Sequence, residues 1–122
     1  MFFILLALSI ALVVPISSSS PFEGKWGVVS KALWSFGDLT VTSSRLKWSS
    51  GKVSSYKVVS ATKAEFLLKL TSKKLPRFDG ITCPFLKLKV DGNDLEVSFY
   101  KGFPDSKDSN LAMWGVYTHS NN

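Results

Sequence analysis

The sequence predicts an all-β fold: a small antiparallel meander barrel of about eight strands, with a two-sheet β-sandwich as the alternative. Three observations lead to this prediction. Apolar residues recur mostly at every second position, which is the period of a half-buried strand. Turn-forming residues interrupt the chain every several positions, and no stretch has the apolar spacing of a long amphipathic helix. Antiparallel strands with one apolar face must close or stack to bury that face.

The apolar segment at the start of the chain predicts a signal peptide. Residues 1–16 read MFFILLALSIALVVPI, carry no charge, and are followed by four serines and Pro21. Such a run ending in small residues is typical of a secretory signal, and it is shorter than the roughly 20 residues of a transmembrane helix. We expect removal of residues 1–19, after Ser18 or Ser19, and a single exported domain over residues 20–122: periplasmic, secreted or extracellular. Because no Lys or Arg precedes the run, an uncleaved membrane anchor stays the alternative.

Eight alternating runs define the expected strands. They cover residues 23–30, 39–42, 45–48, 56–61, 65–71, 85–90, 95–100 and 111–118. Across the second and third runs, one face collects the apolar side chains Leu39, Val41, Leu46 and Trp48. The clearest turn is Asp91-Gly92-Asn93-Asp94, whose composition suits the positive φ of a tight hairpin. We expect residues 72–80 to form a longer loop.

The charge of the chain is basic. The formal net charge is +6 at pH 7, and all 15 Lys and Arg lie beyond Ser20. Such a balance suits an anionic partner, but outward lysines on strands also keep a β-protein soluble. The lysines are spread along the chain, which favours the second interpretation.

A short motif near the first strand resembles a known family. Gly24-Lys25-Trp26 is similar to the Gly-x-Trp of lipocalins and other calycins, in which the Trp plugs the closed end of an eight-stranded meander barrel. The resemblance implies a calycin-like barrel over residues 23–118, with Trp26 as its structural plug, and a binder of small molecules. The family's Thr-Asp-Tyr-like turn, and its Arg near the last strand, are absent.

Aromatic residues are numerous, with four Trp and nine Phe in the chain. Core packing accounts for most of them, and an aromatic-lined pocket for an apolar ligand is the functional interpretation. Two of them, in residues 31–37, lie where a lid over a barrel mouth is expected. The candidate ligand-binding residues are Trp34, Phe36, Trp48, Tyr56 and Phe66.

A basic loop gives a second candidate site. Lys73, Lys74 and Arg77 are a candidate anion patch, to which Lys87 and Lys89 could add. A solvated loop is the simpler interpretation.

Catalytic chemistry finds little support in the sequence. The one histidine, His119, and the one cysteine, Cys83, lack a recognisable orienting third group for a dyad. A lone cysteine makes no internal disulfide, and we expect Cys83 to be a buried apolar residue, with an intermolecular disulfide as the alternative. Turn chemistry explains the Asp pairs at 91/94 and 105/108 better than metal binding. We expect no catalytic residue, no metal and no cofactor.

These observations predict an exported, non-enzymatic, lipocalin-like binding protein for a small, mostly apolar ligand. The alternative is a protein-interaction module or inhibitor, which would contact an envelope or secreted protein through its loops and basic surface. Export argues against nucleic acid as a partner, and membrane contact is expected only if residues 1–19 stay attached.

Overall fold

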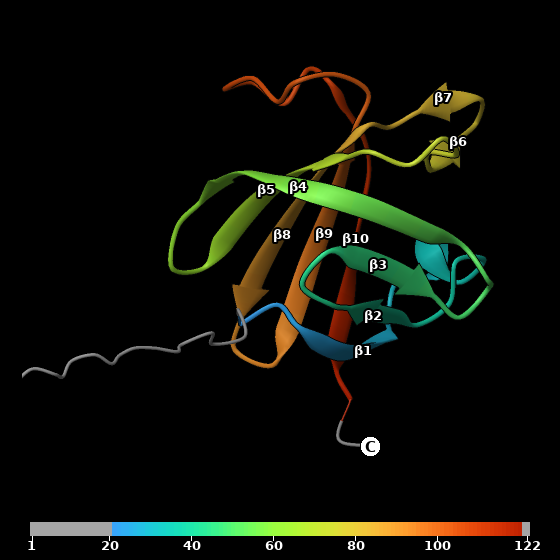
Figure 1. Ribbon diagram of the computed structural model, residues 1–122, viewed down its shortest axis with the longest axis vertical. Helices are drawn as coiled ribbons and strands as arrows, with labels where there is room; N and C mark the ends of the chain where they lie inside the picture. Colours follow the sequence, from blue (N-terminus) through green and yellow to red (C-terminus); the bar gives the residue numbers. More distant parts are fainter. Residues whose placement is uncertain (1–20, 121–122) are drawn as a thin grey trace, which may run out of the picture.

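Alternating apolar and polar residues build antiparallel strands along most of the chain (Figure 1). The computed structural model describes residues 21–120, so the predicted signal peptide and its cleavage site lie outside the described residues. Within residues 21–120, no helix is both long and apolar enough to cross a membrane. The elements are β1 (Gly24–Val28), η2 (Lys31–Leu33), β2 (Leu39–Val41), β3 (Arg45–Trp48), β4 (Val53–Ala61), β5 (Glu65–Leu70), β6 (Arg77–Phe78), β7 (Ile81–Thr82), β8 (Phe85–Asp91), β9 (Asp94–Tyr100) and β10 (Leu111–His119).

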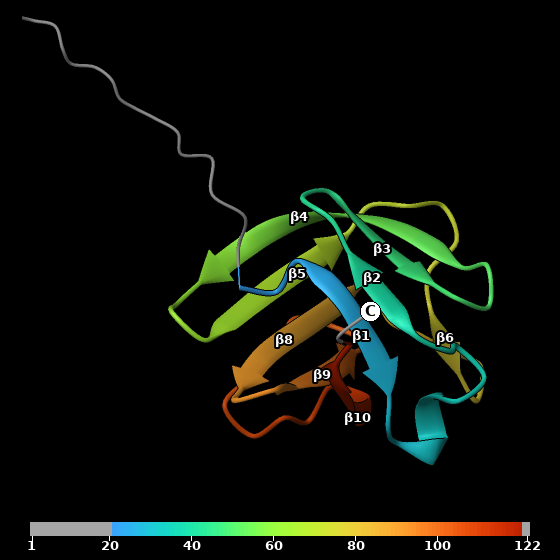
Figure 2. The same ribbon diagram turned by 90° about the horizontal axis from the view of Figure 1, so that it is seen from below.

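Eight of these strands close into a barrel, in the order β1-β10-β9-β8-β5-β4-β3-β2. Every neighbouring pair is antiparallel, and β1 completes the ring by pairing with both β2 and β10. Figure 2 shows β1 lying between those two strands. The prediction of a closed meander barrel is therefore confirmed, and the two-sheet sandwich is not the fold.

One hairpin was absent from the sequence prediction. Residues 77–82, expected to be mostly loop, form the β6–β7 hairpin, in which Phe78 pairs with Ile81. The two turn residues, Asp79 and Gly80, adopt positive φ angles of 50° and 81°. An Asp-Gly pair favours this two-residue turn, so the signal was present in the sequence.

Because consecutive strands run in opposite directions, the connections between them lie alternately at the two ends of the barrel. The β2–β3, β4–β5 and β8–β9 turns lie at one end with the start of β1 and the finish of β10; we call this the terminal end. The other end of the barrel is its mouth. It carries the β1–β2 connection with η2, the β3–β4 turn, the β5–β8 connection with β6–β7, and the β9–β10 loop. The longer connections are all at the mouth, so we look for a site there.

Side chains fill the interior. Leu86 and Leu88 of β8 and Val97 of β9 are buried, whereas Lys89, the residue after Leu88, is exposed. The four residues predicted to share one face of β2 and β3, Leu39, Val41, Leu46 and Trp48, are all buried. Cys83 is a buried free thiol, as expected, and burial raises the pKa of that thiol. The core is thus built by one face of the closed sheet.

The core makes a first prediction about stability. Leu88→Ala should lower the free energy of unfolding by about 2–5 kcal/mol, because it leaves a cavity among packed side chains. The exposed neighbour gives the matched control: Lys89→Ala should change that free energy by less than about 0.5–1 kcal/mol. Urea denaturation followed by circular dichroism measures both. Equal losses in the two variants would contradict the assignment of Leu88 to the inner face of β8 and of Lys89 to its outer face.

Candidate functional site

A cleft opens at the mouth of the barrel. Its volume is about 640 Å³, and three connections contribute to its wall: the β1–β2 connection, the β3–β4 turn and the β5–β8 connection. Its lining residues are Ser35, Trp48, Ser50, Gly51, Lys52, Val53, Ser54, Lys74, Leu75 and Pro76. Apolar and polar side chains therefore share one surface.

Trp48 provides the aromatic wall of this cleft. Its side chain is buried, and its indole Nε1–H donates a hydrogen bond of 3.2 Å to the hydroxyl oxygen of Tyr117. Tyr117 lies on β10, so this bond joins β3 to β10, two strands that are separated in the sheet by β1 and β2. Burial raises the pKa of Tyr117 to about 12, so the phenol keeps its proton further into the alkaline range than an exposed tyrosine does.

An aromatic plug closes the barrel beneath the mouth; we define it as Phe36, Trp48, Phe78 and Phe99. Phe36 stacks on Phe78 with ring centroids 5.1 Å apart and an interplanar angle of 9°. Phe99 lies beneath, with its centroid 4.7 Å from that of Phe78. Because these rings occupy the top of the interior, the cleft lies at the rim of the barrel and not inside it.

The segment that carries Phe36 is tied to the β3–β4 turn. The Ser50 N–H donates to the Phe36 carbonyl at 3.1 Å, and the Ser49 N–H donates to the Asp38 carbonyl at 2.8 Å. The Ser49 hydroxyl accepts from the Asp38 N–H at 2.9 Å. Gly37 between them has a φ of 79°, and a Cβ there would collide with the Ser49 hydroxyl, so this position requires glycine. The wall of the cleft is thereby held in place by backbone contacts.

A second hollow adjoins the cleft. It measures about 400 Å³ and is lined by Lys52, Lys73, Lys74, Leu75, Arg77 and Thr82. Lys52, Lys74 and Leu75 also line the first cleft, so the two hollows are continuous. The structure brings together the three predicted anion-patch residues and adds Lys52, which sequence reasoning missed.

The structure does not bring the five predicted ligand-binding residues together at one site. Phe36 and Trp48 meet at the mouth, with ring centroids 5.4 Å apart. Trp34 is 58% exposed and does not line the cleft. Tyr56 donates its hydroxyl to the carbonyl of Thr42, in the β2–β3 turn, at 2.6 Å. Phe66 packs on Phe22 with centroids 4.1 Å apart. Tyr56 and Phe66 thus make contacts toward the terminal end.

Trp26 is buried at the terminal end. Its Nε1–H donates to the Phe22 carbonyl at 2.9 Å, and its ring meets the edge of His119 at a centroid distance of 5.3 Å. Trp26 therefore makes its contacts toward the terminal end and does not line the mouth cleft.

Two lysines expected near the basic loop lie elsewhere. Lys87 and Lys89 line a separate groove of about 220 Å³, whose other residues include Glu65 and Glu96. Lys89 pairs in register with Glu65 on one side and Glu96 on the other. They follow β8 to the outer face of the sheet, so the extended patch is not formed.

The remaining candidates for chemistry are also far apart. Cys83 precedes β8 at the mouth, where its N–H donates to the Pro76 carbonyl at 2.9 Å, whereas His119 ends β10 at the terminal end. The structure therefore does not bring Cys83 and His119 together. Among the residues that the structure describes, no group of three or more His, Cys, Asp or Glu could hold a metal ion.

Comparison with known proteins gives no relative: the sequence matches no protein-family profile, no curated protein and no solved structure. The closed eight-stranded antiparallel barrel is compatible with the lipocalin-like resemblance of Gly24-x-Trp26.

The buried phenol predicts a pH dependence. Tyr117 has a folded pKa of about 12, above its usual value of 10.0, so between these values the unfolded chain releases a proton that the folded chain keeps. The free energy of unfolding should therefore fall as the pH rises through this window. Tyr117→Phe has no such proton, so its free energy should fall less steeply than that of the wild type.

Urea denaturation of both proteins at about pH 9 and about pH 11.5 measures this difference. Tyr117→Phe leaves every other ionisable group in place, so the variant corrects for their contribution. Parallel declines would show that Tyr117 does not keep its proton in the folded state.

Proposed function

We propose that this chain is an exported, non-enzymatic, lipocalin-like protein that binds a small, mostly apolar ligand in the mouth cleft. The observation that carries the proposal is the cleft of about 640 Å³ at the end of a closed barrel, with a buried indole in its wall. That volume is within the range of small-molecule sites, which runs from about 300 to 1,000 Å³.

The composition of the cleft supports a ligand that is mainly apolar. Trp48, Val53, Leu75 and Pro76 offer hydrocarbon and aromatic surface. Three serines, Ser35, Ser50 and Ser54, offer hydroxyl groups that could orient the ligand. Because the aromatic plug fills the interior, the ligand would lie across the rim, with part of its surface in water.

The barrel and its Trp26 motif support the lipocalin-like part of the proposal, and residues 1–16 support export. Among the described residues that line the cleft, the titratable side chains are those of Lys52 and Lys74, which supports binding over catalysis. The barrel, the apolar N-terminal segment and the cleft together favour a carrier or sensor of small molecules.

A second candidate function is a protein-interaction module. The observation that favours it is the exposure of large apolar side chains: Trp34, Phe103 and Trp114 are 58%, 59% and 55% exposed. Trp34 and Phe103 lie in mouth connections, where a partner protein could contact them.

Binding of a neutral apolar dye tests the first candidate. We expect Nile red to bind the exported protein, and Val53→Asn to weaken this binding about fivefold to tenfold, because one apolar contact in the cleft is lost. Val59→Asn is the matched control: Val59 is also exposed on β4 but does not line the cleft. Dye fluorescence gives the affinities, and the intact mass shows whether residues 1–19 are removed.

Absence of dye binding to the wild type, or equal weakening by both substitutions, would overturn this assignment. Trp34→Ser separates the two candidate functions, since it should leave dye affinity unchanged and reduce only contact with a protein partner.

A further inference from the structure

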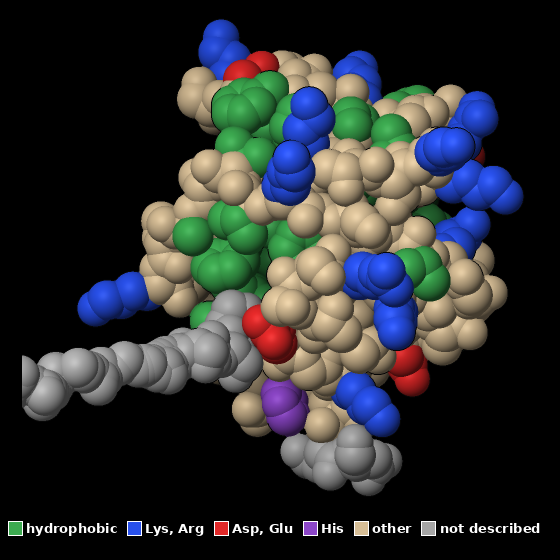
Figure 3. Space-filling view, viewed as in Figure 1, with side chains coloured by type: hydrophobic (Ala, Val, Ile, Leu, Met, Phe, Trp, Pro, Cys, Tyr) green, Lys and Arg blue, Asp and Glu red, His purple; other side chains and the backbone are tan. Residues whose placement is uncertain are grey.

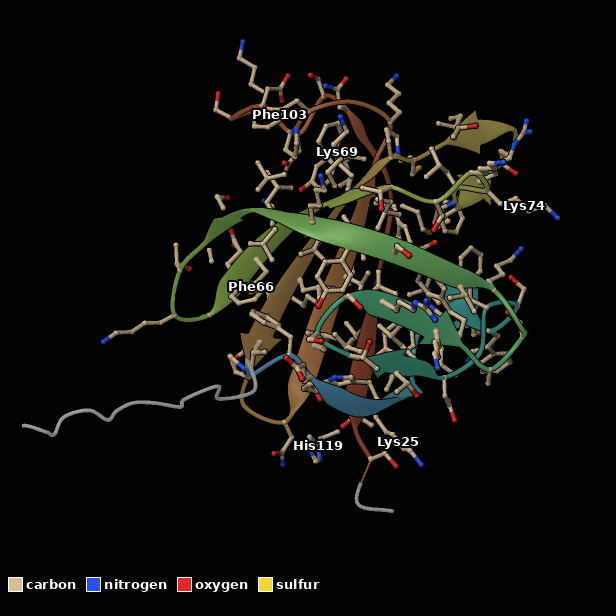
Figure 4. All side chains as sticks on the ribbon, in the orientation of Figure 1. Lys25, Phe66, Lys69, Lys74, Phe103 and His119 are labelled. Carbon is tan, nitrogen blue, oxygen red and sulfur yellow. The ribbon has the colours of Figure 1, made fainter. Side chains whose placement is uncertain are left out.

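The mouth site has an apolar side and a cationic side. The cleft with Trp48 continues into the second hollow through Lys52, Lys74 and Leu75, which line both. Lys73 and Arg77 line only the second hollow. Figure 4 shows Lys74 projecting beside β6, and Figure 3 shows Lys and Arg side chains gathered at the upper right, where β6 and β7 lie in Figure 1.

The fold itself positions these cations. Strand alternation in β6 sends Phe78 into the aromatic plug and leaves Arg77 exposed. The Arg77 guanidinium donates from Nη2 to the Gly80 carbonyl, across the hairpin turn, at 3.2 Å. Lys52 comes from the β3–β4 turn, with its Nζ 5.4 Å from the centroid of the Phe36 ring. Two segments far apart in sequence thus deliver positive charge to one hollow.

No carboxylate balances this charge among the lining residues of the two hollows, within the part of the chain that the structure describes. Asp79, the acidic residue closest to Arg77 in sequence, lies in the β6–β7 turn and outside the lining. Four like charges repel each other, and an anion in the hollow would relieve that repulsion. A phosphate monoester carries close to two negative charges at pH 7, and it accepts hydrogen bonds from both ammonium and guanidinium groups.

We propose that the second hollow binds the phosphate monoester group of the ligand whose apolar part occupies the mouth cleft. This inference rests on the proposed function, and it specifies an amphiphile with a doubly charged head. Lys52 and Lys74 hold the group at the junction of the two hollows, and Arg77 and Lys73 approach it from the far side.

Calorimetric titration of the full chain with three probes of one chain length tests the inference: octyl phosphate, octan-1-ol and octyltrimethylammonium. We expect octyl phosphate to bind at least about tenfold more tightly than octan-1-ol, and the cation more weakly than either. Lys73→Gln with Arg77→Gln should remove that preference and leave the affinity for octan-1-ol unchanged, because both residues line only the second hollow. Both side chains are exposed, so the double variant should fold. Lys57→Gln, an exposed lysine on β4 outside both hollows, is the matched control.

The outcomes separate this inference from the proposed function. Equal affinity for octyl phosphate and octan-1-ol would overturn the phosphate site and leave the apolar cleft in place. Failure of both probes to bind would overturn both. A preference for octyl phosphate that survives the double substitution would place the anion elsewhere and also overturn the inference.

The phosphate group could belong to a free amphiphile or to a membrane lipid, and a vesicle arm distinguishes these sources. Phosphatidylcholine vesicles with and without phosphatidic acid are floated with the protein. We expect a free ligand, hence no flotation with either vesicle, because the Ser49 and Ser50 contacts hold the walls of the cleft in place around the ligand. Flotation that requires both phosphatidic acid and Lys52 would assign the same phosphate chemistry to a membrane headgroup, and would overturn the free ligand.

Discussion

The pairing of β1 with β10 is the constraint on which the rest of the structure depends. It joins the first and last strands of the described chain, with Trp26 opposite His119 and Val28 opposite Tyr117. Without it, β1 and β10 would each present an unpaired edge, and the apolar face of the sheet would stay open to water. Closure instead turns that face inward, where a barrel of eight strands has just enough room for side chains. The hydrogen bond from Trp48 to Tyr117 spans the same closed interior.

A filled interior moves any binding site to the rim. Phe36 and Phe78 come from two different connections and pack with Phe99. Their rings fill the upper part of the barrel interior, so a ligand has no room there. What remains is the space between connections at the mouth, where the largely buried Trp48 is one of the lining residues. The same geometry gathers lysines and an arginine, because the β3–β4 turn and the β5–β8 connection meet around one hollow. Apolar surface and positive charge thus meet along one continuous hollow.

Much of the fold could be predicted from the sequence, and the site only in part. The period of two placed all eight barrel strands within a few residues, because burial of one face leaves a direct mark on alternation. The β6–β7 hairpin was missed because each of its strands has two residues, too few to show a period, although Asp79-Gly80 marked the turn. Trp34 and Phe36 lie in a segment with no period, so nothing local tells that one is exposed and the other buried. Tyr56 and Phe66 were grouped with Phe36 and Trp48 as candidate ligand-binding residues, because alternation reports which face a residue occupies, and not which end of the barrel. Lys52 was missed because its neighbours at the site, Lys73, Lys74 and Arg77, come much later in the chain and are brought near by the pairing of β4 with β5.

The most direct test of the rim site is a nuclear magnetic resonance titration of the ¹⁵N-labelled protein with octyl phosphate. We expect shifts of the backbone amides of residues 50–54, 73–75 and 77 and of the Trp48 indole N–H, because these groups surround the two hollows. The Trp26 indole N–H, which is bonded to the Phe22 carbonyl and lies outside the lining of both hollows, should not move. Shifts centred on Trp26 and Phe66, with residues 50–54 unchanged, would place the ligand at the terminal end and contradict the account.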